Sequence, residues 1–171
     1  MFEVEAKIPI SKKEFEVLKK RLTKEAESPE ARLSADTYYE RLKSAFIRVR
    51  QNEKKYTFGI KRRETIEGIE SNLEMEWGIK DIRKWRSLLA RLKIRPSVRK
   101  IKNSTVYRLE DFNIELNHVS HLGYFLEIER LVSHKEDVPE AKNNLVKLFK
   151  ELGYSPKRFE PKPYLELLEN V

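Results

Sequence analysis

The sequence predicts an α+β domain built on one antiparallel sheet. Two observations indicate this class: eight segments alternate apolar with polar or charged residues at the period of a β-strand, and short polar turns join the last three. Amphipathic helical segments flank the strands. The chain has 171 residues, enough to bury one core, so we expect a single domain over residues 1–171.

The expected elements follow from apolar periodicity and from turn residues. Strands are predicted at 1–10, 36–42, 71–79, 98–109, 112–119 and 124–132, with a hairpin over 45–64 that turns at Asn52 and Glu53. Helices are predicted at 11–27, 80–94, 139–153 and 163–171.

Each of the first three helices has a sequence signal of its own. Ser11 and Glu14 have the spacing of a capping box, which opens the first helix, and Gly153 is a C′ stop for the third. The expected buried stripe of the first helix is Phe15, Val17, Leu18 and Leu22. That of the second helix is Ile82, Trp85, Leu88, Leu89 and Leu92.

Composition narrows the functional class. The residues are 39% hydrophobic and 37% charged, which indicates a folded core under a strongly ionised surface. The formal charge of +8 favours an anionic partner such as a nucleotide, polyphosphate or nucleic acid. Absence of cysteine excludes disulfides and thiolate metal sites, and there is neither a signal-peptide pattern nor an apolar run that could span a bilayer. We therefore expect a cytoplasmic protein without a membrane partner.

The charged faces of the strands carry the functional signal. In the opening EVEAK, Glu3, Glu5 and Lys7 share one face, because side chains alternate along a strand. The same pattern recurs in later strands. It gives seven carboxylates and six bases: Glu3, Glu5, Glu74, Glu76, Glu115, Glu127 and Glu129, with Lys7, Arg48, Arg50, Lys61, Lys100 and Lys102.

Two architectures satisfy this alternation. One is an open sheet with a wet, charged face; the other is a closed barrel with a charged lumen and helices outside. Unpaired charges removed from water cost several kcal/mol each, so such a lumen would hold water and bind ions.

The array resembles that of the CYTH superfamily, the triphosphate tunnel metalloenzymes, which includes class IV adenylyl cyclases and thiamine triphosphatases. EVEAK matches the family's ExExK signature. The segments DTYYE, FIRVRQ, FGIK, LEMEW, HLGYFLEIE and KPYLELL follow in the family's order, so that the resemblance covers nearly the whole chain.

The resemblance implies a closed, eight-stranded antiparallel barrel, a tunnel in which carboxylates hold Mg²⁺ or Mn²⁺ and bases hold a triphosphate. The implied catalytic residues are Glu3, Glu5 and Lys7. The implied metal ligands are Glu3, Glu5, Glu127 and Glu129, with Glu74 and Glu76 as further candidates that a solvated sheet face explains equally well. The implied phosphate ligands are Lys7, Arg48, Arg50, Lys61, Lys162 and one or both of Lys100 and Lys102.

Two residues depart from the family pattern. Asn117 stands where the family has an aspartate, which leaves open whether the protein has a second metal site. Asn72 stands where an arginine is frequent, which leaves open whether Arg62 or Arg63 supplies a phosphate contact.

The predicted function is metal-dependent hydrolysis of a triphosphate: tripolyphosphate, a nucleoside triphosphate or thiamine triphosphate. We favour hydrolysis over cyclisation because water is always available as the nucleophile. The alternative is a class IV adenylyl cyclase that makes cyclic AMP and pyrophosphate from ATP. A non-catalytic polyphosphate or RNA binding module is the competing class, and nucleic acid is disfavoured because acids are about as numerous as bases on the strand faces. The oligomeric state, including a homodimer, stays open.

Overall fold

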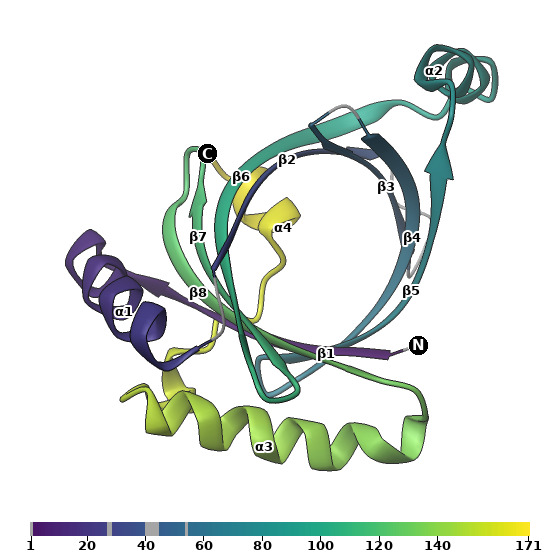
Figure 1. Ribbon diagram of the computed structural model, residues 1–171. Helices are drawn as coiled ribbons and strands as arrows, with labels where there is room; N and C mark the ends of the chain where they lie inside the picture. The colour runs from purple at the N-terminus through teal and green to yellow at the C-terminus, as the bar shows by residue number, and fades with distance from the viewer. Residues whose placement is uncertain (1, 27–28, 40–44, 54) are drawn as a thin grey trace.

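A computed structural model describes residues 2–26, 29–39, 45–53 and 55–171. Its strands form a closed barrel in the order β1-β5-β4-β3-β2-β6-β7-β8, with antiparallel pairing throughout (Figure 1). The strands are β1 Phe2–Ile10, β2 Glu30–Tyr39, β3 Ala45–Asn52, β4 Lys55–Ile66, β5 Ile69–Ile79, β6 Pro96–Leu109, β7 Phe112–Val119 and β8 Gly123–Val132. This confirms the predicted fold class, with the barrel closed.

Strand β1 closes the barrel because it pairs with β5 on one side and β8 on the other. Glu5 lies opposite Glu70 of β5 and opposite Glu129 of β8. Lys7 lies opposite Glu127. Directly opposed residues share a face, so this register gathers side chains from three strands inside the barrel.

The main hydrophobic core lies outside the barrel wall rather than within it. Val4, Ala6 and Ile8, which alternate with the inward charges of β1, are at most 2% exposed and pack in one cluster with residues of α1 and α3. Figure 1 shows α3 beneath β1, with α1 beside the barrel. Burying a side chain the size of Val4 or Ile8 contributes about 1.5–3 kcal/mol, so the apolar faces hold the helices against the wall.

Helix α1, Lys12–Glu25, begins with the predicted capping box between Ser11 and Glu14. Phe15, Leu18 and Leu22 are buried as expected. The prediction for Val17 is wrong, because its side chain is 60% exposed. Phe15, Leu18 and Leu22 follow the i, i+3, i+7 spacing of one helix face, and Val17 lies on a different side of the helix.

Helix α3, Val138–Glu151, follows a short 3₁₀ turn at Lys135–Asp137. Its face of Ala141, Leu145, Leu148 and Phe149 is buried against the barrel. The helix ends as predicted, since Gly153 adopts φ +92°, a conformation that glycine takes without a steric penalty.

Helix α2, Ile82–Arg91, differs from its prediction. Leu89 is buried, but Leu88 is 47% and Leu92 60% exposed. The helix contacts the barrel mainly along one edge, where the ring of Trp85 stacks on Phe58 with centroids 4.6 Å apart. Figure 1 shows it outside the ring of strands, away from α1 and α3.

The C-terminal segment returns to the barrel and enters it. The backbone N–H of Glu160 donates to the carbonyl oxygen of Lys7, after a 3₁₀ turn at Pro156–Arg158. Helix α4, Tyr164–Leu168, then lies within the ring of strands in Figure 1. Among the described residues, no helix is long and apolar enough to cross a bilayer.

Candidate active site

A charged cavity lies inside the barrel, and most of the predicted site residues line it. From the predicted set, the lining contains Glu3, Glu5, Lys7, Arg48, Arg50, Lys61, Glu74, Lys100, Lys102, Glu115, Glu127 and Glu129. Glu76 and Lys162 are not among these side chains. The described lining holds seven acids and seven bases once Glu70 and Arg32 are added, so the cavity combines both signs of charge.

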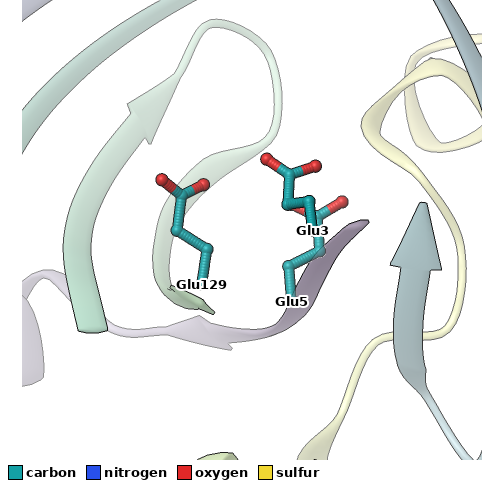
Figure 2. A group of neighbouring side chains, drawn as sticks. All are labelled: Glu3, Glu5 and Glu129. Atoms are coloured by element: carbon teal, nitrogen blue, oxygen red, sulfur yellow. The ribbon is translucent and has the colours of Figure 1, made fainter. Parts of the chain in front are cut away.

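Three carboxylates meet at one point of the wall. The ligand oxygens of Glu3, Glu5 and Glu129 all lie within 4.8 Å of one another (Figure 2). The ammonium of Lys61 donates to Glu3 at 2.7 Å and to Glu5 at 2.8 Å, while Glu129 accepts from the amide of Asn113 at 2.9 Å. When all three carboxylates are ionised, they carry two negative charges more than the ammonium of Lys61 balances. An oxygen-only donor set with that excess fits a hard divalent cation such as Mg²⁺ or Mn²⁺.

The protonation of this cluster depends on its burial. Burial raises the pKa of Glu3 to about 7, although Lys61 opposes the shift. Burial, with the neighbouring Glu3 and Glu115, also raises the pKa of Glu129 well above its ordinary value. Burial acts on Glu5 too, but Lys61 and Lys7 outweigh it and hold the pKa of Glu5 below the usual range. The cluster is therefore anionic chiefly at Glu5 without a further cation.

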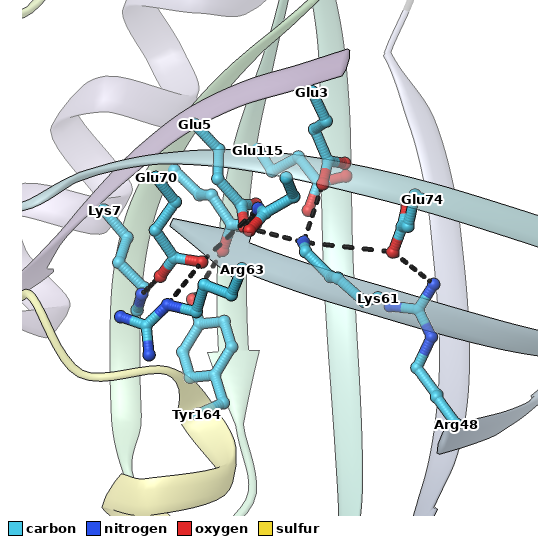
Figure 3. A network of polar contacts seen from close by, with 12 residues as sticks. Glu3, Glu5, Lys7, Arg48, Lys61, Arg63, Glu70, Glu74, Glu115 and Tyr164 are labelled. Carbon is cyan, nitrogen blue, oxygen red and sulfur yellow. Dashed lines mark hydrogen bonds and ion pairs between the residues drawn. The ribbon is translucent and has the colours of Figure 1, made fainter. Parts of the chain in front are cut away.

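The predicted phosphate ligands on β1 and β6 are each held by a carboxylate. Lys7 contacts Glu70 at 2.9 Å, as Figure 3 shows. Lys102 donates to Glu115 at 2.5 Å. Lys100 lies 2.9 Å from a carboxylate oxygen of Asp36, a residue that is fully buried. Both Lys100 and Lys102 therefore face the cavity.

The two arginines of β3 are also paired. Arg50 forms a fork on Asp36, with nitrogen–oxygen distances of 2.8 and 3.2 Å. Arg48 donates to Glu74 at 2.9 Å and to Glu76 at 2.5 Å. Glu74 and Glu76 thus lie with an arginine rather than in the three-carboxylate cluster, and the side chain of Glu76 is 37% exposed.

Glu127, a further predicted metal ligand, lies in different surroundings from the cluster. It accepts from the hydroxyl of Tyr164 at 2.8 Å and from the amide of Asn117 at 3.3 Å. The ring of Tyr164 in turn lies near two cations, with its centroid 5.4 Å from the Lys7 nitrogen and 5.0 Å from that of Lys100. Helix α4 thereby packs against the basic part of the cavity.

Asn117 sits between two buried acids. Its amide nitrogen donates to Glu115 and to Glu127, both at 3.3 Å, and the residue is fully buried. Its oxygen has no hydrogen-bond partner in the described part of the chain. In this position an amide bridges two carboxylates, whereas an aspartate would add a third negative charge.

Two buried acids of the wall were not predicted from the sequence. Glu70 is 3% exposed and follows the alternation of β5 back from Glu74, so the period of two could have found it. Asp36 is the first residue of the segment DTYYE, but the sequence did not predict a role for it in the site. Both hold cations that were themselves predicted correctly to face inward.

Asn72 contacts the acidic cluster, since its amide donates to Glu5 at 2.9 Å. On β4, Arg63 lies directly opposite Asn72 in the strand pairing. Arg63 shares the inward face with Lys61, and its Nε lies 3.2 Å from Glu70. Arg62 is exposed on the opposite face. Arg63 is therefore the arginine beside this position.

Access to the cavity is uneven. Side chains near one end are partly exposed, for example Glu74 at 21% and Arg50 at 25%. Lys7 and Lys100, beside Tyr164, are only 6% and 4% exposed. A ligand that reached the deep lysines would enter past Glu74 and Arg50. Lys162 is exposed and the structure does not bring it together with the other predicted phosphate ligands.

Comparisons with known proteins agree with this geometry. The chain is 31% identical over 96 residues to the Methanocaldococcus jannaschii protein named "Putative adenylate cyclase MJ0240", a match over 55% of this chain and only 54% of that relative. The PH1819 protein from Pyrococcus horikoshii is 30% identical, with 98% of each chain covered and a TM-score of 0.83.

A second archaeal structure, a conserved hypothetical protein from Pyrococcus furiosus, is 28% identical, with 96% of this chain and 99% of that chain covered and a TM-score of 0.82. HpAC1 from Hippeastrum shares the fold at 18% identity, with 99% and 95% covered and a TM-score of 0.69, and its description reports a dominant triphosphatase activity. The sequence profile of the CYTH domain matches residues 1–164. The chain therefore belongs to the CYTH domain family.

Proposed function

We propose that the protein is a divalent-metal-dependent enzyme that hydrolyses a triphosphate, either tripolyphosphate, a nucleoside triphosphate or thiamine triphosphate. The observation that carries the proposal is the presence, in one cavity, of a cluster of three carboxylates whose oxygens lie within 4.8 Å of one another and of a set of inward lysines and arginines. Family membership supports the same class of chemistry. A triphosphatase activity reported for HpAC1 is compatible with this fold.

Glu3, Glu5 and Glu129 would hold the metal ion. Bound Mg²⁺ or Mn²⁺ supplies Lewis-acid stabilisation of negative charge on the phosphate oxygens. The amide of Asn113 orients Glu129, and the amide of Asn72 orients Glu5, through hydrogen bonds of 2.9 Å each. These neighbours keep the carboxylates in place without adding charge.

The bases would bind and align the triphosphate. Arg48 and Arg50 offer planar forks that match phosphate oxygens, and Lys7, Lys100 and Lys102 offer point charges. Each is already paired with a carboxylate, so a bound phosphate would take over part of that pairing. Preorganised cations of this kind stabilise the charge that develops in phosphoryl transfer.

The proposed reaction needs no covalent intermediate with the protein. A water oxygen attacks the terminal phosphorus, the bond to the bridging oxygen breaks, and phosphate and a diphosphate leave. The cavity's role is to align the three phosphates and to neutralise their charge.

A second candidate is cyclisation of ATP, favoured by the name of the Methanocaldococcus relative. There the ribose 3′-hydroxyl attacks the α-phosphorus and pyrophosphate leaves. The same acids and bases would serve, with the triphosphate placed so that its α-phosphorus lies near the acidic cluster.

The test measures phosphate, pyrophosphate and cyclic AMP released from ATP, tripolyphosphate and thiamine triphosphate, with Mg²⁺, Mn²⁺ or EDTA. We expect phosphate release that needs metal and falls at least about 100-fold in Glu5→Gln and Glu129→Gln, the order of loss typical when a preorganised charge-stabilising group is removed. Glu16→Gln, an exposed position on α1, is the matched control and should retain wild-type activity.

If wild type forms cyclic AMP and Glu5→Gln does not, the activity is cyclisation of ATP rather than hydrolysis. Binding of tripolyphosphate without turnover of any substrate would reduce the protein to a binding module. Turnover that persists in EDTA and in both variants would refute the metal site.

A further inference from the structure

The positive charge of the chain is concentrated in one segment. Residues 82–99, which comprise α2 and the start of β6, carry seven cations and no aspartate or glutamate. The formal charge of the whole chain is +8. We call these cations the basic track: Arg83, Lys84, Arg86, Arg91, Lys93, Arg95 and Arg99.

The basic track faces solvent, without ion pairs to the acids that the structure describes. All seven residues are exposed. Across the described residues, none of them lies within ion-pair distance of a carboxylate. An incoming anion therefore meets exposed cations that no carboxylate of the described residues neutralises.

Two adjoining hollows run along the track on the outer surface of the barrel. Arg86, Lys93 and Arg95 line one, together with Tyr39. Arg86 and Arg99 line the other, together with Gln51 and Tyr56. Arg86 belongs to both, and neither hollow has an acidic residue in its described lining.

This surface is separate from the cavity inside the barrel. Arg99 points outward, whereas the next residue, Lys100, points inward to Asp36. Tyr39 and Thr37 likewise alternate with the inward Tyr38 and Asp36. The barrel wall therefore separates the basic residues of the cavity from the basic track, although the net charge of the chain counts both together.

We propose that the basic track binds single-stranded nucleic acid through its phosphate backbone. Five of the seven cations are arginines, whose planar forks bind phosphate in a bidentate manner and stack on bases. Tyrosine and glutamine side chains along the hollows add hydrogen-bonding groups. Acids equal bases only on the strand faces that enter the cavity; on the track acids are absent, which is typical of a surface that binds nucleic acid.

The packing of α2 favours nucleic acid over a bilayer. Basic amphipathic helices bind membranes by inserting their apolar face. Here Leu89 is buried and Trp85 is stacked on Phe58 of the barrel, so part of that face is already occupied. Only Leu88 and Leu92 extend from it toward solvent.

The proposal is tested by measuring the affinity for a labelled oligouridylate of about 20 nucleotides by fluorescence anisotropy, at salt concentrations between 50 and 200 mM. The salt slope for single strands is about −0.7 per phosphate contact. The variant Arg86→Gln/Lys93→Gln/Arg95→Gln/Arg99→Gln should bind at least about 10-fold more weakly and show a slope flatter by up to about 3, since four contacts are lost.

The matched control neutralises four exposed lysines of α1, Lys12→Gln/Lys13→Gln/Lys20→Gln/Lys24→Gln, which changes the net charge equally. It should retain most of the binding. An equal loss in both variants would show attraction by net charge alone and would overturn the proposal, as would absence of binding to wild type.

Two additional measurements distinguish the track from the cavity and from a membrane-binding surface. Tripolyphosphate at constant ionic strength should leave oligouridylate binding unchanged; competition would place the strand in the cavity and overturn the proposal. Vesicles containing phosphatidylserine should not bind; capture by vesicles without oligouridylate binding would assign the track to membranes. Triphosphate turnover should be unchanged in the track variant, so failure of this proposal and failure of the proposed enzyme activity are distinguishable.

If a thermal melt shows that the quadruple variant is not folded, the double variant Arg95→Gln/Arg99→Gln tests the same track. Its slope should be flatter by up to about 1.4. A slope equal to that of wild type would overturn the proposal.

Discussion

The cavity and the basic track carry similar numbers of cations in opposite environments. Inside the barrel, Lys7, Lys61, Lys100 and Lys102 each lie within 2.9 Å of a carboxylate. On the track, no cation lies within ion-pair distance of a described acid. A buried charge without a partner costs several kcal/mol, whereas an exposed one is solvated by water, so only the interior requires acids.

This difference affects how each region would bind an anion. In the cavity, a phosphate exchanges one partner of a lysine for another, and the cation is already oriented. On the track, a phosphate displaces water and counterions, so binding depends strongly on salt. This difference supports the two proposed ligands, a compact triphosphate for the cavity and an extended polyanion for the track.

Removal of an interior acid tests this contrast most severely. Asp36→Ala removes the carboxylate that holds both the buried Lys100 and the partly exposed Arg50. We expect the free energy of unfolding to fall by about 3–5 kcal/mol, the typical cost of breaking a buried ion pair. Urea denaturation measures the change, and tripolyphosphate should restore part of it because an anion replaces the lost partner.

The matched surface variant is Glu30→Gln, which breaks the exposed pair with Arg32. It should leave the free energy of unfolding nearly unchanged, because solvent screens an exposed pair. If the two variants differ little, interior pairing contributes no more than surface pairing, and the contrast fails.

A smaller effect is expected at the amide between two acids. Asn117→Asp loses two hydrogen bonds and places a third carboxylate beside Glu115 and Glu127. In EDTA the variant should lose about 1–3 kcal/mol of stability, the cost of unsatisfied buried groups. If the new carboxylate completes a second metal site, Mn²⁺ should restore this loss and raise metal-dependent turnover.

Thermal melts in EDTA and in Mn²⁺, beside wild type, give the measurement. A rate and a melting temperature that do not respond to Mn²⁺ beyond the wild-type response would exclude a second site at this position.

The weakest effect concerns a helix cap and ion pair at the surface. The backbone N–H of Ser11 donates to Glu14, Arg158 lies beside it, and together they lower the pKa of Glu14 to about 2 from 4.5. The lowered pKa means that the stabilisation is present above pH 4.5 and is lost as the pH falls toward 2. Glu14→Gln should cost about 1 kcal/mol at pH 7, the size of a helix-cap effect with the ion pair screened by solvent, and almost nothing at pH 2.

Urea denaturation at both pH values measures the difference, with Glu16→Gln as the control on the same helix. A cost that is equal at pH 7 and pH 2 would show that the carboxylate's charge does not contribute.

Much of the site follows from the strand period. Because side chains alternate strictly along a strand, EVEAK and its repeats predicted which residues face inward, and the structure confirms that Glu3, Glu5 and Lys7 line one cavity. The same rule would have found Glu70. Helix positions and the capping box of α1 also follow from local signals.

The surface that covers a helix is harder to predict than the helix itself. Helix α2 forms within the segment whose periodicity predicts it, yet Leu88 and Leu92 remain exposed. Periodicity shows which side chains share a face, but the area that covers this face depends on the path of the chain from β5 to β6.

Local sequence is enough to set the phase of the strands, the charge of their inward faces and the caps of the helices, because these depend on neighbours within a few residues. Pairing between distant strands settles that β1 closes the barrel and that Glu129 rather than Glu127 joins Glu3 and Glu5. These features depend on the register of segments far apart in the chain, and a shift of one residue would turn each inward side chain outward.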